Sequence, residues 1–231
     1  MIASLAARRE IVTVCKRLYD RGLIAGAEGN VSVRLAPDRI LVTPSGMSKT
    51  DVAVEDLVEV EPDGTPLRGN RRPSSEIAVH LRIYARRADV TAVVHAHPPV
   101  ATGFAVAGEG FSGCVLPEMI FQVGWVPLVP YDTPGTEALA DRFEPYLDAH
   151  EAFLMANHGA ITVGPSLELA HQRMESLEHA ARILFTARLL GRVNELTAEQ
   201  VAAVMAARER AGIPGAYPGC HTPDSRRREH E

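Results

Sequence analysis

A chain of 231 residues, 46% of them hydrophobic, is long enough for one folded domain and too apolar to be disordered. Its 24 basic and 29 acidic residues leave a net charge of −5, and its only basic run is Arg226–Arg228, so nucleic acid is not an expected partner. No apolar stretch reaches the ~18 residues of a membrane-spanning helix, and the charged, amphipathic N-terminus is unlike a signal peptide, so no membrane partner is expected.

The cysteines indicate the cellular compartment in which the protein is expected. Cys15, Cys114 and Cys220 are odd in number and far apart in the sequence. No two of them have the spacing of a metal-binding pair, and they define no disulfide framework. This usage predicts a protein of the reducing cytoplasm.

The first part of the chain predicts a helix followed by three strands. Apolar residues recur at three- and four-residue steps from Leu5 to Tyr19, which is the period of an amphipathic helix, and Gly22 ends it. A Pro-Asp turn between two short apolar or alternating segments predicts a β-hairpin, and another strand follows it. The three strands are expected at residues 30–35, 39–43 and 57–61.

The rest of the chain alternates helices and strands. Helices are predicted at residues 75–87, 99–106, 135–147, 166–190 and 197–211, and strands at 92–97, 126–129, 152–156 and 160–163. The clearest helix begins after the hydroxyl N-cap Ser166 and stops at Gly191. Because strands and helices are interspersed, we expect helices layered on one sheet, in a single domain of residues 1–211 with a flexible tail at 212–231.

Four residues form a candidate metal site. His95 and His97 end a predicted strand, and side chains two apart on a strand project to the same face, so both imidazoles can reach one cation. His158 lies in a tight connection between two strands, and Glu76 begins a helix. Three imidazoles and one carboxylate suit zinc, with manganese or cobalt as alternatives. His80, one helical turn after Glu76, is an alternative ligand.

Each of these residues also has a structural interpretation. A His-x-His pair at the end of a strand can be incidental, and His158 can be a loop histidine that donates to the backbone. Glu76 can be a first-turn glutamate that is favourable to the helix dipole.

Three short segments are candidates for binding an anion: 26–30, 43–46 and 73–75. Each offers backbone N–H groups freed by glycine, or hydroxyls, and the third also precedes a helix N-terminus. None matches a Walker or dinucleotide-binding motif, and each alone is an ordinary turn. Because Ser74 and Ser75 directly precede Glu76, a phosphate bound there would lie beside the cation.

Five motifs follow one another in the chain: Gly29-Asn30-Val31-Ser32, Thr43-Pro44-Ser45-Gly46, Pro73-Ser74-Ser75-Glu76, His95-Ala96-His97 and Asn157-His158-Gly159. In this order they resemble the class II aldolase/adducin family, over about residues 5–190. Within the family the resemblance extends to aldolases of L-fuculose 1-phosphate and of 5-deoxyribulose or methylthioribulose 1-phosphate. It implies a three-layer α/β/α fold with a central, largely antiparallel sheet, and a homotetramer with sites between subunits.

The resemblance also implies roles for individual residues. The divalent metal, zinc first, would be bound by Glu76, His95, His97 and His158. The substrate phosphate would be bound by Gly29, Asn30, Ser45, Gly46, Ser74 and Ser75. The implied reaction is cleavage of a ketose 1-phosphate to dihydroxyacetone phosphate and a small aldehyde through a metal-stabilised enediolate, with Glu76 as acid and base.

Two further expectations concern the proton donor and the competing functions. Where the fuculose-phosphate aldolase has a tyrosine that protonates the aldehyde oxygen, the nearest residue here is Glu118, and Tyr131 and Tyr217 are alternative donors. On the same scaffold, a pentulose-phosphate 4-epimerase and a 3-oxo-acid phosphate decarboxylase are alternatives to the aldolase. A non-catalytic, adducin-like binding module is an alternative of another class, and it would not need the four ligands.

Overall fold

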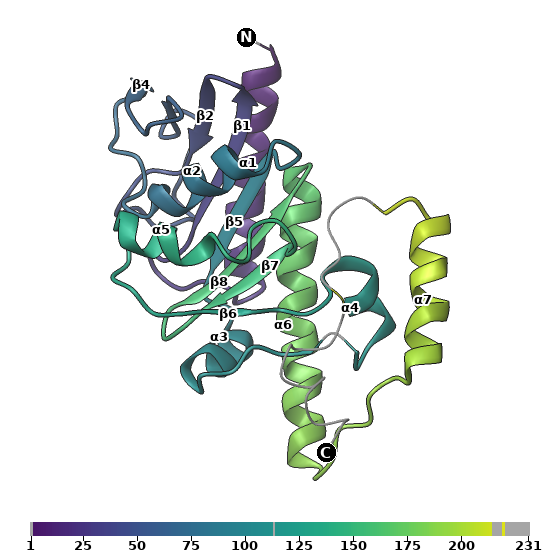
Figure 1. Ribbon diagram of the computed structural model, residues 1–231. Helices are drawn as coiled ribbons and strands as arrows, with labels where there is room; N and C mark the ends of the chain where they lie inside the picture. Colours follow the sequence, from purple (N-terminus) through teal and green to yellow (C-terminus); the bar gives the residue numbers. More distant parts are fainter. Residues whose placement is uncertain (1, 113, 214–218, 220–231) are drawn as a thin grey trace.

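The computed structural model describes residues 2–112, 114–213 and 219 and has one eight-stranded sheet between layers of helices (Figure 1). The strands are β1 (Asn30–Ala36), β2 (Arg39–Val42), β3 (Val58–Val60), β4 (Pro66–Arg68), β5 (Ala92–Ala96), β6 (Leu128–Val129), β7 (Ala152–Met155) and β8 (Gly159–Gly164). The helices are α1 (Ile2–Asp20), α2 (Ile77–Arg86), α3 (Pro99–Val106), α4 (Pro117–Gln122), α5 (Glu137–Phe143), α6 (Leu167–Leu189) and α7 (Ala198–Arg210). Most of the tail expected at 212–231, with Tyr217, lies outside the described residues.

The sheet confirms the expected architecture. Its strand order is β4-β3-β2-β1-β5-β8-β7-β6, and every neighbouring pair is antiparallel except β6 and β7. At its centre, His95 of β5 lies opposite Asn30 of β1 on one side and Ile161 of β8 on the other. The register of these central strands therefore puts a predicted metal ligand next to a predicted phosphate-binding residue.

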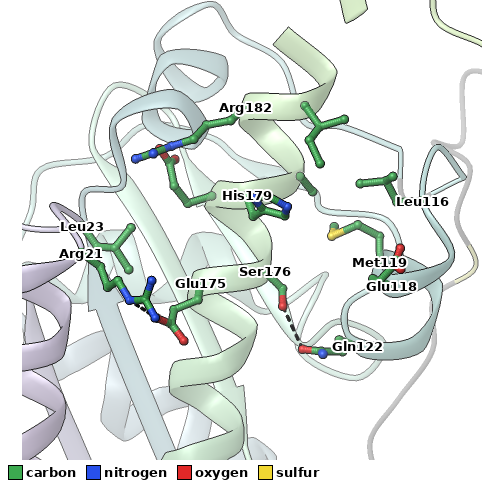
Figure 2. A pocket seen from close by; sticks show the side chains of 13 residues that line it. Arg21, Leu23, Leu116, Glu118, Met119, Gln122, Glu175, Ser176, His179 and Arg182 are labelled. Carbon is green, nitrogen blue, oxygen red and sulfur yellow. Dashed lines mark hydrogen bonds and ion pairs between the residues drawn. The ribbon is translucent and has the colours of Figure 1, made fainter. Parts of the chain in front are cut away.

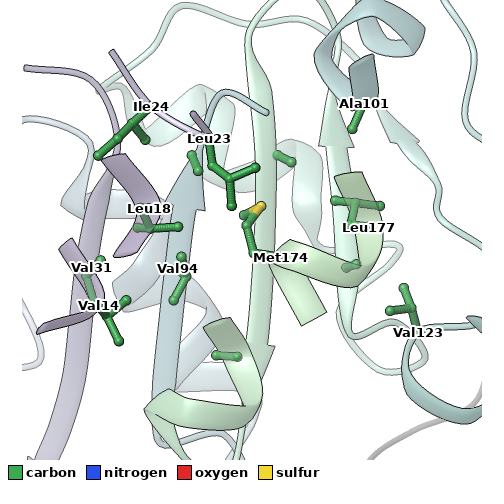
Figure 3. Packing of buried hydrophobic residues seen from close by; sticks show 14 of the residues in the cluster. Val14, Leu18, Leu23, Ile24, Val31, Val94, Ala101, Val123, Met174 and Leu177 are labelled. Atoms are coloured by element: carbon green, nitrogen blue, oxygen red, sulfur yellow. The ribbon is translucent and has the colours of Figure 1, made fainter. Parts of the chain in front are cut away.

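Alternation along the strands divides the core between the two faces of the sheet. In β5, Val94 packs into the cluster formed with α1, α3 and α6, part of which Figure 3 shows, whereas Val93 packs into the cluster formed with α2 and α5. His95 and His97 are an even number of residues from Val93. His95 is therefore directed to the α2 side of the sheet, where Glu76 begins that helix.

The long helix α6 is set by the signals found in the sequence. The Ser166 hydroxyl accepts a hydrogen bond from the Leu169 N–H, and Gly191 adopts a φ of 100° after the helix. Buried Met174 and Leu177 face the sheet in Figure 3. Helix α7 stands apart from the sheet in Figure 1 and packs on α4 through a small separate apolar cluster.

The structure differs from the expected elements at α2, α5, β4 and α4. Helix α2 starts at Ile77 because the segment before it is a turn, in which the Ser74 hydroxyl accepts the Glu76 N–H. Helix α5 ends at Phe143, and turns occupy the rest of the predicted helix. Strand β4 and helix α4 were not predicted, because three and six residues are too few to display a period.

One expectation about the cysteines is wrong. Cys15 is a buried free thiol, but Cys114 is disulfide-bonded, although the number and spacing of the cysteines defined no disulfide framework. Within the part of the chain that the structure describes, no helix has the length and apolar character needed to cross a membrane.

Candidate metal centre

Three histidines far apart in the sequence bring their imidazole rings together at the end of β5. The Nε2 atom of His95 lies 3.2 Å from Nε2 of His97 and 3.2 Å from Nε2 of His158. One ring nitrogen from each residue lies within 4.8 Å of the others. Three nitrogen donors that face a common point at this spacing are able to hold a single cation.

Each ring is positioned by a different local device. His95 is buried within β5, and His97 follows the strand, where its backbone N–H donates to the Leu23 carbonyl at 2.9 Å. His158 lies in the turn from β7 to β8, after Asn157 in the left-handed conformation at φ 56°. Because β8 pairs with β5, this turn brings His158 beside the other two rings.

Gly159 is required by this close packing. A Cβ atom at Gly159 would lie 2.6 Å from Cδ2 of His97 and 2.7 Å from the Ala96 carbonyl oxygen. Distances this short do not occur between real atoms, so any larger residue would displace the imidazole of His97.

Glu76 contacts the histidine group from the side of α2. Its Oε1 lies 3.0 Å from Nε2 of His158 and its Oε2 lies 3.3 Å from Nε2 of His95. The Asn30 amide also donates to Oε2 at 2.8 Å. Burial acts to raise the pKa of this carboxyl, but the neighbouring rings of His158 and His95 outweigh it and hold the pKa well below its usual range. Glu76 is therefore a carboxylate at neutral pH.

A hydrogen bond to the backbone fixes the orientation of the His95 ring and leaves its other nitrogen facing the histidine group. Nδ1 of His95 lies 2.9 Å from the Ala160 carbonyl, and because a carbonyl only accepts, this nitrogen carries the proton. The Nε2 atom of His95 then faces two imidazoles and the Glu76 carboxylate. Burial, followed by the nearby His95 and His158, lowers the pKa of His97 to about 4, so the ring of His97 is neutral at pH 7. A cation fits this donor set.

His80 lies outside the histidine group. It is buried on α2, and its Nδ1 is 2.7 Å from the Ser32 hydroxyl, which is itself 2.8 Å from the Tyr84 hydroxyl. Burial, with a smaller effect from His95, lowers the pKa of His80 to about 3. Its Nε2 has no hydrogen-bond partner among the described residues, and the ring lines a small cavity of about 10 Å³ with Asn30, Glu76 and His95.

Hydrogen bonds join the three anion-binding candidates. The N–H of Val31, directly after the first segment, donates to the Thr43 hydroxyl at 3.2 Å, which holds the end of the first segment against the second. The Ser74 N–H donates to the Thr43 carbonyl at 3.1 Å, which ties the second to the third. The side-chain amide of Asn30 also donates to the Glu76 carboxylate. The three segments are therefore held together next to the histidines. We call residues 26–30, 43–46 and 73–75 together the anion cradle.

The backbone conformation of the anion cradle requires glycine at two positions. Gly29 and Gly46 have φ of 70° and 69°, which side-chain-bearing residues rarely adopt. At Gly29 a Cβ would also lie 2.7 Å from the His95 carbonyl oxygen, so this loop packs directly on the strand of the metal ligand. Ser45, Gly46 and Ser75 are exposed and can reach a ligand, whereas Ser74 is buried.

Glu118 and Tyr131 are not brought to the histidines by this chain. Glu118 is exposed on α4 and lines a groove of about 610 Å³ between α4 and α6 (Figure 2). Tyr131 is exposed just after β6. In the described part of the chain, neither side chain has a hydrogen bond or ion pair with Glu76, His95, His97 or His158.

Two buried charged residues near the site were not found from the sequence. The Glu178 carboxylate on α6 accepts the N–H groups of Val100 and Ala101, at the start of α3 directly after His97 and two prolines. The Lys49 ammonium donates to the Ala27 and Met47 carbonyls. Neither residue belongs to a motif, because each acts through the backbone of a distant segment. The chain has only two lysines, Lys16 and Lys49, and this rarity was the one feature of the sequence that could have drawn attention to Lys49.

Comparison with known families gives one match that covers most of the chain. The family described as Class II Aldolase and Adducin N-terminal domain matches residues 9–185. This range contains the three histidines, Glu76 and all of the anion cradle.

Individual relatives agree with the family match. The chain is 33% identical over 202 residues to the 3-oxo-tetronate 4-phosphate decarboxylase of Pectobacterium atrosepticum, which covers 85% of the chain and 91% of that protein. It is 34% identical over 190 residues to the 5-deoxy-D-ribulose 1-phosphate aldolase of Bacillus thuringiensis, covering 80% and 86%. A solved L-fuculose 1-phosphate aldolase superposes with a TM-score of 0.82 at 29% identity, covering 87% of this chain and 95% of that one.

Proposed function

The chain belongs to the family of class II aldolases and adducin N-terminal domains, and we propose that it is a metal-dependent enzyme that breaks a carbon–carbon bond in a small phosphorylated substrate. The observation that carries this proposal is the convergence of three imidazoles and one carboxylate beside the anion cradle. The family match limits the class of enzyme, and the geometry supplies the residues.

We assign the metal ligands to His95, His97, His158 and Glu76. Three imidazoles and one carboxylate favour zinc, and manganese or cobalt would also be accepted. Glu76 touches His95 and His158 from one side of the group, so it is the ligand best placed to yield its position to a substrate oxygen. A bound divalent cation would supply positive charge for the oxygen that becomes negative when the bond breaks.

The anion cradle would bind the phosphate group. Its exposed N–H groups and hydroxyls come from Ser45, Gly46 and Ser75, and buried Gly29, Asn30 and Ser74 support them. Asn30 and Ser74 are also hydrogen-bonded to Glu76, so the phosphate end of the substrate and the proton-transferring group share one rigid frame. We propose that Glu76, once a substrate oxygen has taken its place among the histidines, takes up a proton from solvent and donates it to the substrate carbon after the bond breaks.

The first candidate reaction is cleavage of a ketose 1-phosphate into dihydroxyacetone phosphate and a small aldehyde. This reaction needs a second group that exchanges a proton with the aldehyde oxygen. Glu118 and Tyr131 are exposed, and in this proposal one of them acts from a neighbouring subunit of a homo-oligomer, for which we propose a tetramer.

One observation favours a second candidate, decarboxylation of a 3-oxo acid phosphate. Carbon dioxide leaves without exchanging a proton, so neither Glu118 nor Tyr131 would be needed, and in the described structure neither of them touches the metal-binding residues. Glu76 would then be sufficient, although Glu28 also reaches the group, with Oε2 3.5 Å from Nδ1 of His97. Relatives with this activity in their names are as similar to the chain as the aldolases are.

A substrate panel tests the proposal and separates the two reactions. Zinc-loaded protein would be incubated with several ketose 1-phosphates and with a phosphorylated 3-oxo acid. Release of dihydroxyacetone phosphate identifies the aldolase, and release of carbon dioxide identifies the decarboxylase. A purified protein that holds no stoichiometric metal and converts none of these compounds would contradict the proposal and favour a binding module.

A further inference from the structure

Lys49 is buried between two segments of the site. Its side chain is 2% exposed, and its ammonium donates to the Ala27 carbonyl at 2.8 Å and to the Met47 carbonyl at 3.0 Å. Ala27 lies in the first segment of the anion cradle, and Met47 directly follows the second. One ammonium therefore bridges the two glycine loops, and it has a third N–H to offer.

The other side chains near Lys49 provide no strong counter-charge. Among the described residues, no carboxylate lies within ion-pair distance of Lys49. The Cys15 thiol is close to Lys49, but burial raises its pKa to about 12, so it is neutral. Glu76 affects Lys49 from a greater distance and is itself paired with histidines.

Several other buried charged residues of the chain have an ionic partner. Arg87 and Arg173 both contact Glu151, and Glu178 is paired with Arg182. Burying a cation without an anionic partner is strongly unfavourable, so such a residue is expected where an anion arrives as a ligand. The loops above Lys49 are open to solvent, with Ala27, Ser45 and Gly46 exposed.

We propose that Lys49 is a positioning residue for the substrate phosphate: it fixes the separation of the loops at residues 26–30 and 43–47 and supplies the buried positive charge that a phosphate dianion neutralises. This inference rests on the proposed function, because it takes the anion to be the phosphate of the substrate. It adds a residue outside the motifs and explains why a lysine is buried there.

The first test measures binding of inorganic phosphate by calorimetry to metal-loaded wild type and to Lys49→Met, which keeps the length of the side chain and removes its charge. The affinity is expected to fall roughly tenfold to a hundredfold, as for the loss of a charge-assisted interaction. Lys16→Met is the matched control, since it removes the other, exposed lysine and changes the net charge equally. Metal content is measured in all three proteins.

A second measurement does not depend on the folding of Lys49→Met. In a Lys16→Arg protein labelled with ¹³C-lysine, Lys49 gives the single lysine Cε signal, because the chain has two lysines. Phosphate is expected to shift this signal, and chloride at equal ionic strength is not.

The outcomes separate the two proposals. If wild type binds metal and phosphate but Lys49→Met binds phosphate equally well, or the Lys49 signal ignores phosphate, the role of Lys49 is wrong and the proposed function stands. If wild type with its metal bound does not bind phosphate at all, the proposed function fails with it.

Discussion

Glu76 has three kinds of neighbour, and each constrains a different part of its proposed role. Contacts with His95 and His158 make it a candidate metal ligand, and the Asn30 amide fixes one of its oxygens. The third neighbour is Ser74 of the anion cradle, whose hydroxyl accepts a hydrogen bond from the Glu76 N–H. A residue so placed can transfer a proton without moving the phosphate.

Replacing Glu76 by glutamine is expected to separate binding from turnover. Gln keeps the size and the hydrogen bond with Asn30 but cannot transfer a proton. Turnover should fall by a hundredfold or more, in the range of ~10²–10⁴ that general acid–base catalysis contributes. Phosphate affinity should stay unchanged, because the cradle is intact. Steady-state kinetics with parallel metal analysis would check this, and a near-normal kcat with bound metal would remove Glu76 from the chemistry.

His80 should make stability depend on pH in the metal-free protein. Its folded pKa is about 3, against about 6.5 in an unfolded chain, so between these values the unfolded state binds the extra proton. The free energy of unfolding should therefore be lost progressively as the pH falls from about 6.5 to about 3, and the contribution is fully present above that window. Urea unfolding at several pH values should show a weaker dependence for His80→Gln. The exposed His179→Gln serves as control, and identical slopes for wild type and His80→Gln would contradict the assignment.

At the scale of elements, the predictable parts are those with a period, a cap or a tight turn. Helix α6 was predicted because Ser166 and Gly191 mark its ends, and the hairpin β1–β2 because a turn separates two short apolar segments. Residues 75–76 were predicted as the start of a helix but lie in a turn, since nothing in the composition shows that the Ser74 hydroxyl accepts the Glu76 N–H. Periodicity reports burial, whereas this turn depends on one side-chain hydrogen bond.

The first residue of β8, Gly159, cannot carry a side chain without a steric clash, and the sequence alone does not show this. Gly159→Ala should disturb the metal centre, because its Cβ would meet His97 at 2.6 Å and the Ala96 carbonyl at 2.7 Å. We expect most of the bound metal to be lost while the fold is retained. Gly103→Ala in α3 is the matched control, since nothing lies within 4 Å of its added Cβ. Metal analysis with circular dichroism checks both variants, and a Gly159→Ala protein with full metal content would show that the ring of His97 yields easily.

At the scale of the whole molecule, the site depends on contacts that the sequence does not display. Residue type and spacing suggested the four candidate ligands and the family resemblance implied the same set, and the antiparallel order β1-β5-β8 explains how Asn30, His95 and the turn at His158 come together. Lys49 and Glu178 were missed because each is joined to the site by hydrogen bonds to the backbone of a remote loop or helix. Such contacts follow from tertiary packing, and spacing along the chain carries no trace of them.

The two helical layers are also joined through the sheet by one buried ionic cluster. Glu151, 1% exposed just before β7, contacts Arg87 at the end of α2 and Arg173 in the middle of α6. Removing the carboxylate takes away the ionic partner that Arg173 has in this cluster, whereas Arg87 keeps its ion pair with Asp89. A buried charge that loses its partner costs about 3–5 kcal/mol, far more than a pair at the surface.

We therefore expect Glu151→Ala to lower the free energy of unfolding by about 3–5 kcal/mol, measured by urea denaturation at neutral pH. The control is Glu109→Ala, which breaks the half-exposed pair of Glu109 with Arg188 and should cost about 1 kcal/mol or less. Glu151→Gln keeps the shape and hydrogen-bonding oxygen, so its cost should fall between those of the two alanine variants. Equal losses for Glu151→Ala and Glu109→Ala would mean that water reaches the cluster, and that the layers are held together by apolar packing alone.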